Sequence, residues 1–184
     1  MLSRGPISSK RCAPISRGVH IRPAESGDLS AILEILNQAI EDQKIAYLQV
    51  QEEKDRRAWF AKQCSASPPL CVVQVDEELC GFAYLSSYRP GREALKHVAE
   101  ISYFIHRDHH RRGLAQALIQ WLEERAFSAG IKVLLAILLE DNGPSRALLD
   151  KVGFRLWGEF PQIARMGTAI TGQVVYGKHI KVGT

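Results

Sequence analysis

Apolar residues recur along this chain with two periods, about two residues in some segments and about 3.6 in others. The first period predicts strands and the second predicts helices. Val19 and Ile21 alternate with polar neighbours as in a half-buried strand. After Asp28, a residue type that caps helix N-termini, apolar residues recur at helical spacing. A second helix is predicted over EEKDRRAWFAKQC, ended by Pro68 and Pro69. The chain therefore opens as a strand followed by two helices.

The second half of the pattern predicts a sheet with further helices. LCVVQVDEELCGFAYLSSY indicates two antiparallel strands around an acidic turn, and HVAEISYFIH a third strand. A helix is expected from Leu114 to about Ser128 with Gly130 as its stop, and then IKVLLAILL as a strand covered on both faces. A short helix, SRALLDKV, closes at Gly153 and Phe154 before strands near RLWGEF and QVVYGKHI. The fold class is α/β.

Length and composition place few limits beyond one domain. The chain has 184 residues, of which 46% are hydrophobic, enough for a single core. Its longest apolar run is far shorter than the roughly 20 residues of a membrane-spanning helix. The four cysteines, Cys12, Cys64, Cys71 and Cys80, form no CxxC pair, which suits a reducing compartment. We expect a cytoplasmic protein.

The positive charge is concentrated at the N-terminus. The formal net charge is +4, but residues 1–22 hold five basic groups and no acid, which leaves 19 basic against 20 acidic groups elsewhere. A nearly neutral domain argues against a nucleic-acid partner, because phosphate binding needs a basic face. We expect residues 1–18 to be a flexible basic extension and residues 19–184 to form the domain. A transit peptide is the alternative, although Pro6 and Pro14 interrupt the helix it would need.

The segment RDHHRRGLA lies between a predicted strand and a predicted helix, where free backbone N–H groups meet the positive end of the helix dipole. Such a junction is an anion site. Gly113 lets the backbone approach a phosphate, Ala115 keeps the first turn small, and Arg111 and Arg112 add charge. The pattern is neither a P-loop nor a dinucleotide fingerprint. The alternative is a solvated basic turn.

Several segments together resemble the GNAT superfamily of N-acetyltransferases. HHRRGLA is similar to its acyl-CoA pyrophosphate loop, with His110 where that loop has Gln or Arg. AEISYFIH, DNGPS and KVGF fall at the family's intervals, and the resemblance covers about residues 19–160. The phosphinothricin or amino-acid N-acetyltransferase group is the most similar. The resemblance implies a mixed central sheet whose parallel strands splay apart, flanked by helices.

The resemblance also implies acetyl-CoA as cosubstrate. The pantetheine arm would lie in the splay, with the backbone near Phe104 and Ile105 facing the thioester oxygen. Asn142 and Ser145 match family positions that bind the pantetheine, although a turn former and a helix start are their alternatives. The implied cofactor contacts are Phe104, Ile105, His110, Arg111, Arg112, Gly113, Leu114, Ala115, Asn142 and Ser145.

Glu100 is the candidate general base. Acetyl transfer needs an uncharged amine, and a half-buried carboxylate can accept the proton that the ammonium loses. Alternation places Glu100 on one face with Ser102 and Phe104, and phosphinothricin-type enzymes carry their base at the matching position. The alternative is a carboxylate paired with Lys96 or His97.

Two other positions limit the functional interpretation. Leu149 lies where many members of the family carry a Tyr, and the phosphinothricin group a His, that can protonate the leaving thiolate. The sequence therefore shows no general acid. Arg89 could bind a substrate carboxylate, and a solvated arginine in a turn is the alternative. Phosphinothricin itself is a doubtful substrate, because Leu95 and Val98 depart from the group's substrate loop.

We expect no metal site, because the clustered histidines lack a carboxylate or cysteine at matching spacing. These are His106, His109 and His110. The tryptophans at 59, 121 and 157 are expected in the core or an interface.

The function that the sequence favours is direct acetyl transfer from acetyl-CoA to the primary amine of a small molecule, an amino acid or analogue. The alternatives are an acyl-CoA-binding sensor or partner protein without turnover, and a peptide or protein N-acetyltransferase. By resemblance we expect a homodimer, with no nucleic-acid or membrane partner.

Overall fold

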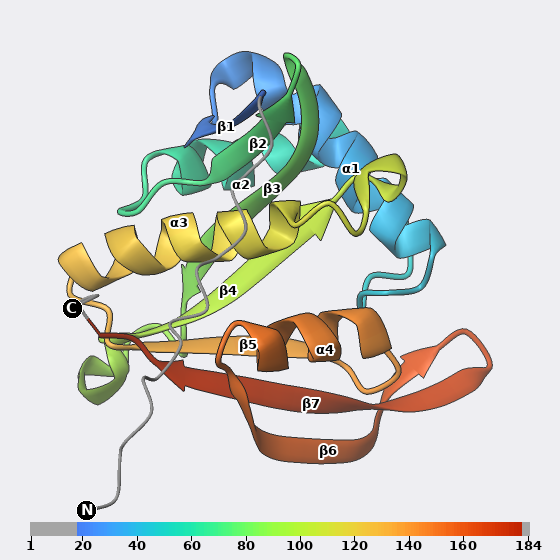
Figure 1. Ribbon diagram of the computed structural model, residues 1–184. Coiled ribbons are helices and arrows are strands. Elements are labelled where there is room, and N and C mark those ends of the chain that lie inside the picture. Colours follow the sequence, from blue (N-terminus) through green and yellow to red (C-terminus); the bar gives the residue numbers. More distant parts are fainter. Residues whose placement is uncertain (1–17, 182–184) are drawn as a thin grey trace, which may run out of the picture.

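The computed structural model describes residues 18–181, which form a twisted sheet covered by helices (Figure 1). The strands are β1 (Val19–Pro23), β2 (Cys71–Val75), β3 (Glu78–Ser87), β4 (Val98–Ile105), β5 (Val133–Leu139), β6 (Arg155–Met166) and β7 (Ala169–His179). The helices are α1 (Leu29–Glu41), α2 (Glu53–Cys64), α3 (Leu114–Ser128) and α4 (Gly143–Lys151), with short 3₁₀ turns at 26–28, 93–95 and 107–109. The predicted α/β class is confirmed.

The seven strands form one mixed sheet in the order β1-β2-β3-β4-β5-β7-β6. All neighbouring strands are antiparallel except β4 and β5, which are parallel. Their pairing is short: it joins Val98, Ala99 and Glu100 to Val133, Leu134 and Leu135, and then stops. Beyond Glu100, β4 stays paired to β3 as far as Ile105. The expected splay therefore opens immediately after Glu100.

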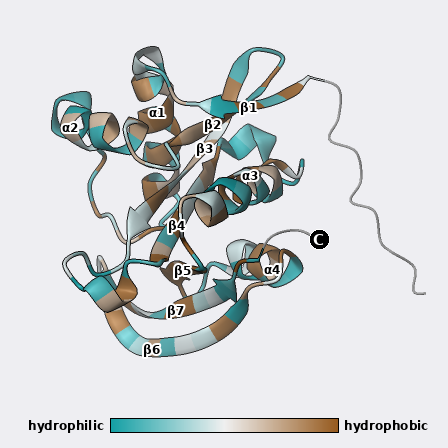
Figure 2. Cartoon of the chain, turned by 90° about the vertical axis from the view of Figure 1, so that its left-hand side faces the viewer, coloured by the Kyte–Doolittle hydropathy of each residue, from teal (hydrophilic) through white to brown (hydrophobic). Residues whose placement is uncertain are grey.

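Alternation along the strands separates two cores. Val72 and Phe82 belong to the cluster that contains α1 and α2, whereas Val73 and Ala83 belong to the cluster that contains α3. Because successive side chains of a strand point to opposite faces, α1 and α2 cover one face and α3 the other. Figure 2 shows the sheet between these helices, with hydrophobic segments along its strands. The loops at the ends of β4 and β5 are thus held between two packed layers.

Some expectations needed correction. Asp28 does not cap α1 with its side chain; its carboxylate accepts the Glu25 N–H (2.7 Å) and pairs with Arg22. The last two strands are longer than predicted and join through MGTAITG. Trp157 is 48% exposed, which excludes the core and leaves the interface as the prediction for this residue. Within residues 18–181 no helix has both the length and the apolar character to cross a bilayer. The prediction for the basic extension at residues 1–18 lies outside the described residues, apart from Gly18.

Candidate active site

The turn between β4 and α3 is the predicted anion cradle. Gly113 is the N-cap of α3 with φ +80, a left-handed conformation that favours glycine. The first intrahelical bond joins the Ala117 N–H to the Gly113 carbonyl (3.1 Å), so the N–H groups of the first turn of α3 have no i−4 carbonyl partner and point out of the helix end. A Cβ at Gly113 would meet no protein atom within 4 Å. The predicted close approach of an anion is therefore sterically open.

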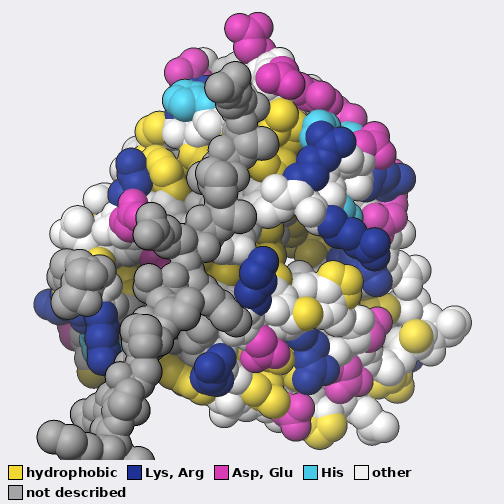
Figure 3. Space-filling model, viewed as in Figure 1, with side chains coloured by type: hydrophobic (Ala, Val, Ile, Leu, Met, Phe, Trp, Pro, Cys, Tyr) yellow, Lys and Arg dark blue, Asp and Glu magenta, His cyan; other side chains and the backbone are white. Residues whose placement is uncertain are grey.

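A cavity of about 570 Å³ lies in front of this cradle, between the start of α3 and α4. Figure 3 shows a hollow with hydrophobic side chains inside it and Lys or Arg side chains around it. Nine of the ten expected cofactor residues line it, all except Arg112; they are Phe104, Ile105, His110, Arg111, Gly113, Leu114, Ala115, Asn142 and Ser145. The residues predicted from the sequence thus come from β4, the turn, α3 and the start of α4, and they meet at one cavity.

His110 lines the cavity but its role differs from the expectation. Its Nε2 lies 3.0 Å from the carbonyl oxygen of Ile105. Because a carbonyl can only accept, Nε2 carries the proton in this contact, and the Nδ1 of a neutral ring is left as an acceptor. The ring of a neutral His110 therefore has no N–H left for a phosphate. Its contact instead fixes the turn against the end of β4.

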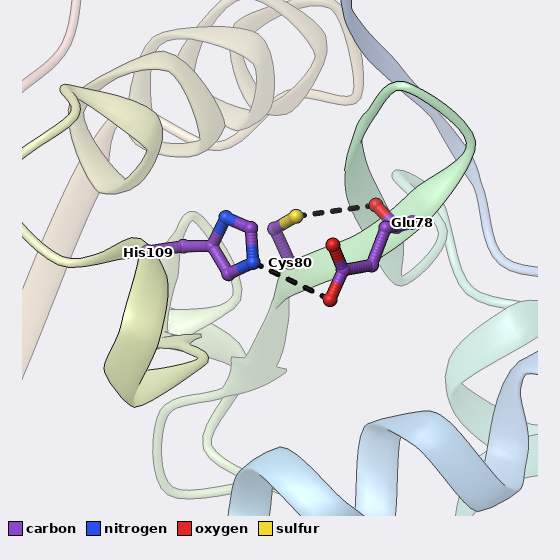
Figure 4. A group of neighbouring side chains, drawn as sticks. All are labelled: Glu78, Cys80 and His109. Atoms are coloured by element: carbon purple, nitrogen blue, oxygen red, sulfur yellow. Dashed lines mark hydrogen bonds and ion pairs between the residues drawn. The ribbon is translucent and has the colours of Figure 1, made fainter.

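Arg112 does not line the cavity, which corrects the prediction that its side chain supplies charge there. Its guanidinium Nη1 lies 3.3 Å from Nδ1 of His109. His109 Nε2 in turn lies 3.4 Å from the Glu78 carboxylate, and the Cys80 thiol is bonded to the Glu78 carbonyl (Figure 4). Burial raises the pKa of the Cys80 thiol. Arg112 is thus turned toward β3.

The ligand atoms of Glu78, Cys80 and His109 lie within 4.8 Å of one another, close enough to invite a metal interpretation. The expectation from spacing alone missed this group, because β3 supplies the carboxylate and the thiol. An arginine can only donate, so Nδ1 of His109 must accept and the neutral ring keeps its proton on Nε2. The nitrogen that faces Glu78 is then a donor. The contacts describe a hydrogen-bonded chain rather than a set of ligands.

Glu100 faces a second cavity of about 240 Å³, together with Tyr84, Ser102 and Phe104. The hydrophobic clusters confirm the predicted alternation, since Phe104 packs with α1 and α2 whereas Ile101 and Tyr103 pack with α3. Glu100 makes no ion pair with any described residue, and Lys96 lies 3.9 Å from Glu93 instead, so the alternative pairing with Lys96 or His97 is wrong. Burial raises the pKa of the Glu100 carboxyl. A half-buried, unpaired carboxylate of this kind is suited to accept a proton.

Asn142 and Ser145 line both cavities. The Asn142 carboxamide oxygen accepts the Ser145 N–H (3.3 Å), and its nitrogen donates to the Lys44 carbonyl (3.3 Å). Asn142 thus caps α4 and ties it to the loop after α1. The turn-former interpretation of Asn142 and the helix-start interpretation of Ser145 are therefore both correct, and both residues lie against the two cavities.

Tyr103 is a site residue that sequence reasoning missed. It lines both cavities, and its buried hydroxyl has no hydrogen-bond partner of acceptable geometry among the described residues. Burial raises the pKa of Tyr103 to about 12, with the nearby Ser145 hydroxyl opposing the rise. Leu149, by contrast, is fully buried in the core. The polar side chain that lines both cavities is therefore Tyr103 of β4, and position 149 of α4 supplies none.

Arg89 lies outside both cavities. It is exposed in the turn after β3, with φ +50, and its carbonyl accepts the Arg92 N–H (3.3 Å). This placement agrees with the alternative interpretation, in which Arg89 is a solvated arginine in a turn. The structure does not bring Arg89 together with Glu100 in one cavity.

Comparison with known proteins identifies the family and the fold. The sequence matches the Acetyltransferase (GNAT) family over residues 32–154. The chain belongs to this family. It is 30% identical over 147 residues to the L-methionine sulfoximine/L-methionine sulfone acetyltransferase of Pseudomonas aeruginosa, which covers 79% of this chain and 85% of that relative. The GNAT domain is thus an acetyl-CoA-dependent N-acetyltransferase.

Solved structures agree with this assignment. The N-acetyltransferase from Staphylococcus aureus Mu50 superposes with a TM-score of 0.84 at 27% identity, over 89% of this chain and 99% of that one. A GNAT superfamily phosphinothricin acetyltransferase from Sinorhizobium meliloti, solved in complex with acetyl-CoA, has a TM-score of 0.81 at 22% identity, over 91% of each chain. The second likeness supports the fold alone.

The residues of this chain fit acetyl-CoA. The pyrophosphate requires an anion cradle without a Cβ, which Gly113 and the start of α3 provide. The pantetheine requires an extended backbone edge, and β4 after Glu100 has no β5 partner. The two cavities share Tyr103, Phe104, Asn142 and Ser145 along their walls. A thioester arm that runs along this shared wall from the larger cavity would end in the smaller cavity, where Glu100 lies.

Proposed function

We propose that this GNAT enzyme transfers an acetyl group from acetyl-CoA to the primary amine of a small molecule, an amino acid or an amino-acid analogue. The observation that carries the proposal is the position of Glu100. It lies at the last β4–β5 pair and faces the smaller cavity, where an amine would meet a thioester held in the splay. The amino-acid-like substrate in the name of the Pseudomonas aeruginosa relative supports the substrate class.

Glu100 acts as the general base in this proposal. An amine that arrives as an ammonium must lose a proton before its nitrogen can attack the acetyl carbon. The raised pKa of Glu100 brings its proton affinity closer to that of the substrate. Backbone N–H groups near Phe104 and Ile105 stabilise the oxyanion, and one such donor is typically worth about 2.7–4 kcal/mol. The C–N bond forms as the C–S bond breaks.

Tyr103 assists the leaving group by hydrogen bonding rather than by complete proton transfer. Its pKa of about 12 exceeds that of an ordinary thiol, about 8.5, so protonating the thiolate from Tyr103 would be uphill. A neutral phenol can still donate a hydrogen bond to the developing negative sulfur. The thiolate then takes its proton from water. Tyr103 thereby offers the donor that Leu149 cannot supply.

The experiment is CoA release, detected as free thiol, from purified protein with acetyl-CoA and a panel of amines. The panel contains L-methionine sulfoximine, L-methionine sulfone, phosphinothricin, common amino acids and short peptides. Turnover on an amino acid or analogue supports the proposal. Tight acetyl-CoA binding without release on any amine would favour the sensor, and turnover restricted to peptides would favour peptide or protein acetylation.

We also propose a homodimer. Several large apolar side chains are exposed along β6 and β7, a pattern that a partner surface would cover. They are Leu156, Trp157, Phe160, Ile163 and Ile170. Sedimentation equilibrium of the full chain tests this proposal, and a monomer at micromolar concentration would contradict it. The described cysteines are free thiols, which supports a cytoplasmic location as a further proposal.

A further inference from the structure

Arg56, on α2, is a half-buried cation without an acidic partner among the described residues. Its guanidinium carbon lies 4.9 Å from the ring centroid of Tyr47 and 5.5 Å from that of Trp59. Aromatic faces at this range attract a cation but do not neutralise its charge. The next residue, Arg57, shows the contrast: its guanidinium is 2.9 Å from the Glu53 carboxylate. Arg56 thus retains an uncompensated positive charge.

The orientation of Arg56 is fixed by Gln51. The Gln51 side-chain oxygen accepts the Arg56 Nε–H at 2.9 Å, while its side-chain nitrogen donates to the Gln49 carbonyl at 2.6 Å. Asn37 of α1 binds both backbone groups of Gln51, at 2.7 and 3.0 Å. With Nε occupied, the two terminal nitrogens of Arg56 form an open fork. This fork matches the two oxygens of a carboxylate.

The fork lies beside the cavity that contains Glu100. Tyr47, on which Arg56 packs, lines that cavity, as does Tyr84, whose ring is 5.2 Å from that of Trp59. Burial raises the pKa of the Tyr84 hydroxyl; the Glu100 charge raises it further, and the Arg56 charge lowers it. The base and the cation therefore act on the same hydroxyl. Glu100 lines the cavity, and Arg56 packs against Tyr47 of its wall.

We propose that Arg56 binds the carboxylate of the amine substrate and so selects amino acids over neutral amines. The proposal rests on the acetyl transfer proposed above and adds the group that recognises the substrate. An amino acid carries a carboxylate beside its amine, so Arg56 and Glu100 can address the two ends of the same molecule. An amine without a carboxylate would leave the Arg56 charge unpaired. Neither Arg56 nor Arg89, the arginine that the sequence suggested, lines the cavity, but Arg56 packs on Tyr47, which does.

The test compares Arg56→Gln with Arg57→Gln, a neighbouring change of the same chemistry on the exposed side of α2. The substrates are L-methionine sulfoximine and its α-carboxamide, which has the same side chain and amine but no carboxylate. We expect Arg56→Gln to lower kcat/KM for the acid by about 10- to 100-fold, mainly through KM. The carboxamide should change less than about 2-fold, and Arg57→Gln should match wild type on both.

Arg56→Lys sharpens the test, because it keeps the charge but loses the planar fork; we expect an intermediate loss on the acid only. Equal losses on acid and carboxamide in Arg56→Gln would show a structural role and overturn the assignment. Wild-type activity that does not distinguish the two substrates would also overturn it, while leaving acetyl transfer intact. If wild type does not turn over L-methionine sulfoximine, the pair is made from the amino acid of the panel that it does acetylate; turnover of none of them would overturn the proposed function and the Arg56 subsite with it.

Discussion

The Gly113→Ala substitution should change both the stability of the fold and the affinity for the cofactor, and a control variant allows the two effects to be measured separately. Gly113 has φ +80, and a Cβ there meets no protein atom within 4 Å. The only expected loss of folding free energy is therefore that of an L-residue in the left-handed region. That cost is about 1–2 kcal/mol. Gly91 offers a matched control, because it has φ +82 and equally open space in a turn that lines neither cavity. Both variants should lose a similar free energy of unfolding.

The two variants should differ in binding. A Cβ at Gly113 projects into the space where the backbone N–H groups of the cradle would meet the pyrophosphate, so we expect the Kd for CoA to rise by about 10-fold or more. Gly91→Ala should bind CoA as wild type does. Calorimetric titration with CoA measures the affinity, and urea unfolding measures the stability. Unchanged affinity in Gly113→Ala would refute the cradle, and an equal loss in both variants would show a global effect.

Three further changes test the account. Tyr103→Phe should lower kcat by about 10-fold with the calorimetric Kd for CoA unchanged, because only the hydrogen bond to the leaving sulfur is lost. Asn142→Ala should cost about 1 kcal/mol in urea unfolding, since the α4 cap to Ser145 is lost. Burial tends to raise the pKa of Asp28, but its bonds to Arg22 and the Glu25 N–H lower it overall. The pair therefore stabilises the fold above pH 4, about the unfolded pKa, and that stability is lost as pH falls through the lower folded pKa. The free energy of unfolding of Asp28→Asn should depend less on pH in the acid range than that of wild type.

Elements with a buried face were predictable from the sequence. The alternation of β4 placed Glu100 on the face of Ser102 and Phe104, and Phe104 does pack in a different cluster from Ile101 and Tyr103. Helix α3 has the predicted bounds, because its apolar stripe and Gly130 are both strong signals. The edge strand β6 was predicted too short for the opposite reason. Nearly all of its residues are exposed, so it carries no alternation that a sequence can show.

The directions of side chains in turns could not be predicted. Arg112 turns to His109 and His110 to the Ile105 carbonyl; both partners are near in the sequence, but irregular turns have no periodic spacing from which such contacts could be predicted. The position of Arg56 likewise depends on Gln51 and Tyr47 in the loop before α2, and Gln51 is itself held by Asn37 of α1. The resemblance to the family's substrate loop favoured Arg89, because YRPGREALKHVAE keeps both Arg89 and Glu100. Contacts within irregular loops, which no periodic pattern shows, decide where each arginine lies.

The most direct test of the central claim is the pH dependence of kcat/KM for the amine substrate in wild type and Glu100→Gln. Glu123→Gln is the matched control, because burial also raises the pKa of Glu123 but its partner is Lys178, outside both cavities. We predict that wild type and Glu123→Gln lose activity as pH falls through the raised Glu100 pKa. Glu100→Gln should lack that limb and be slower by about 10²- to 10⁴-fold. A Glu100→Gln variant with the wild-type rate and acid limb would contradict the assignment of Glu100 as the base.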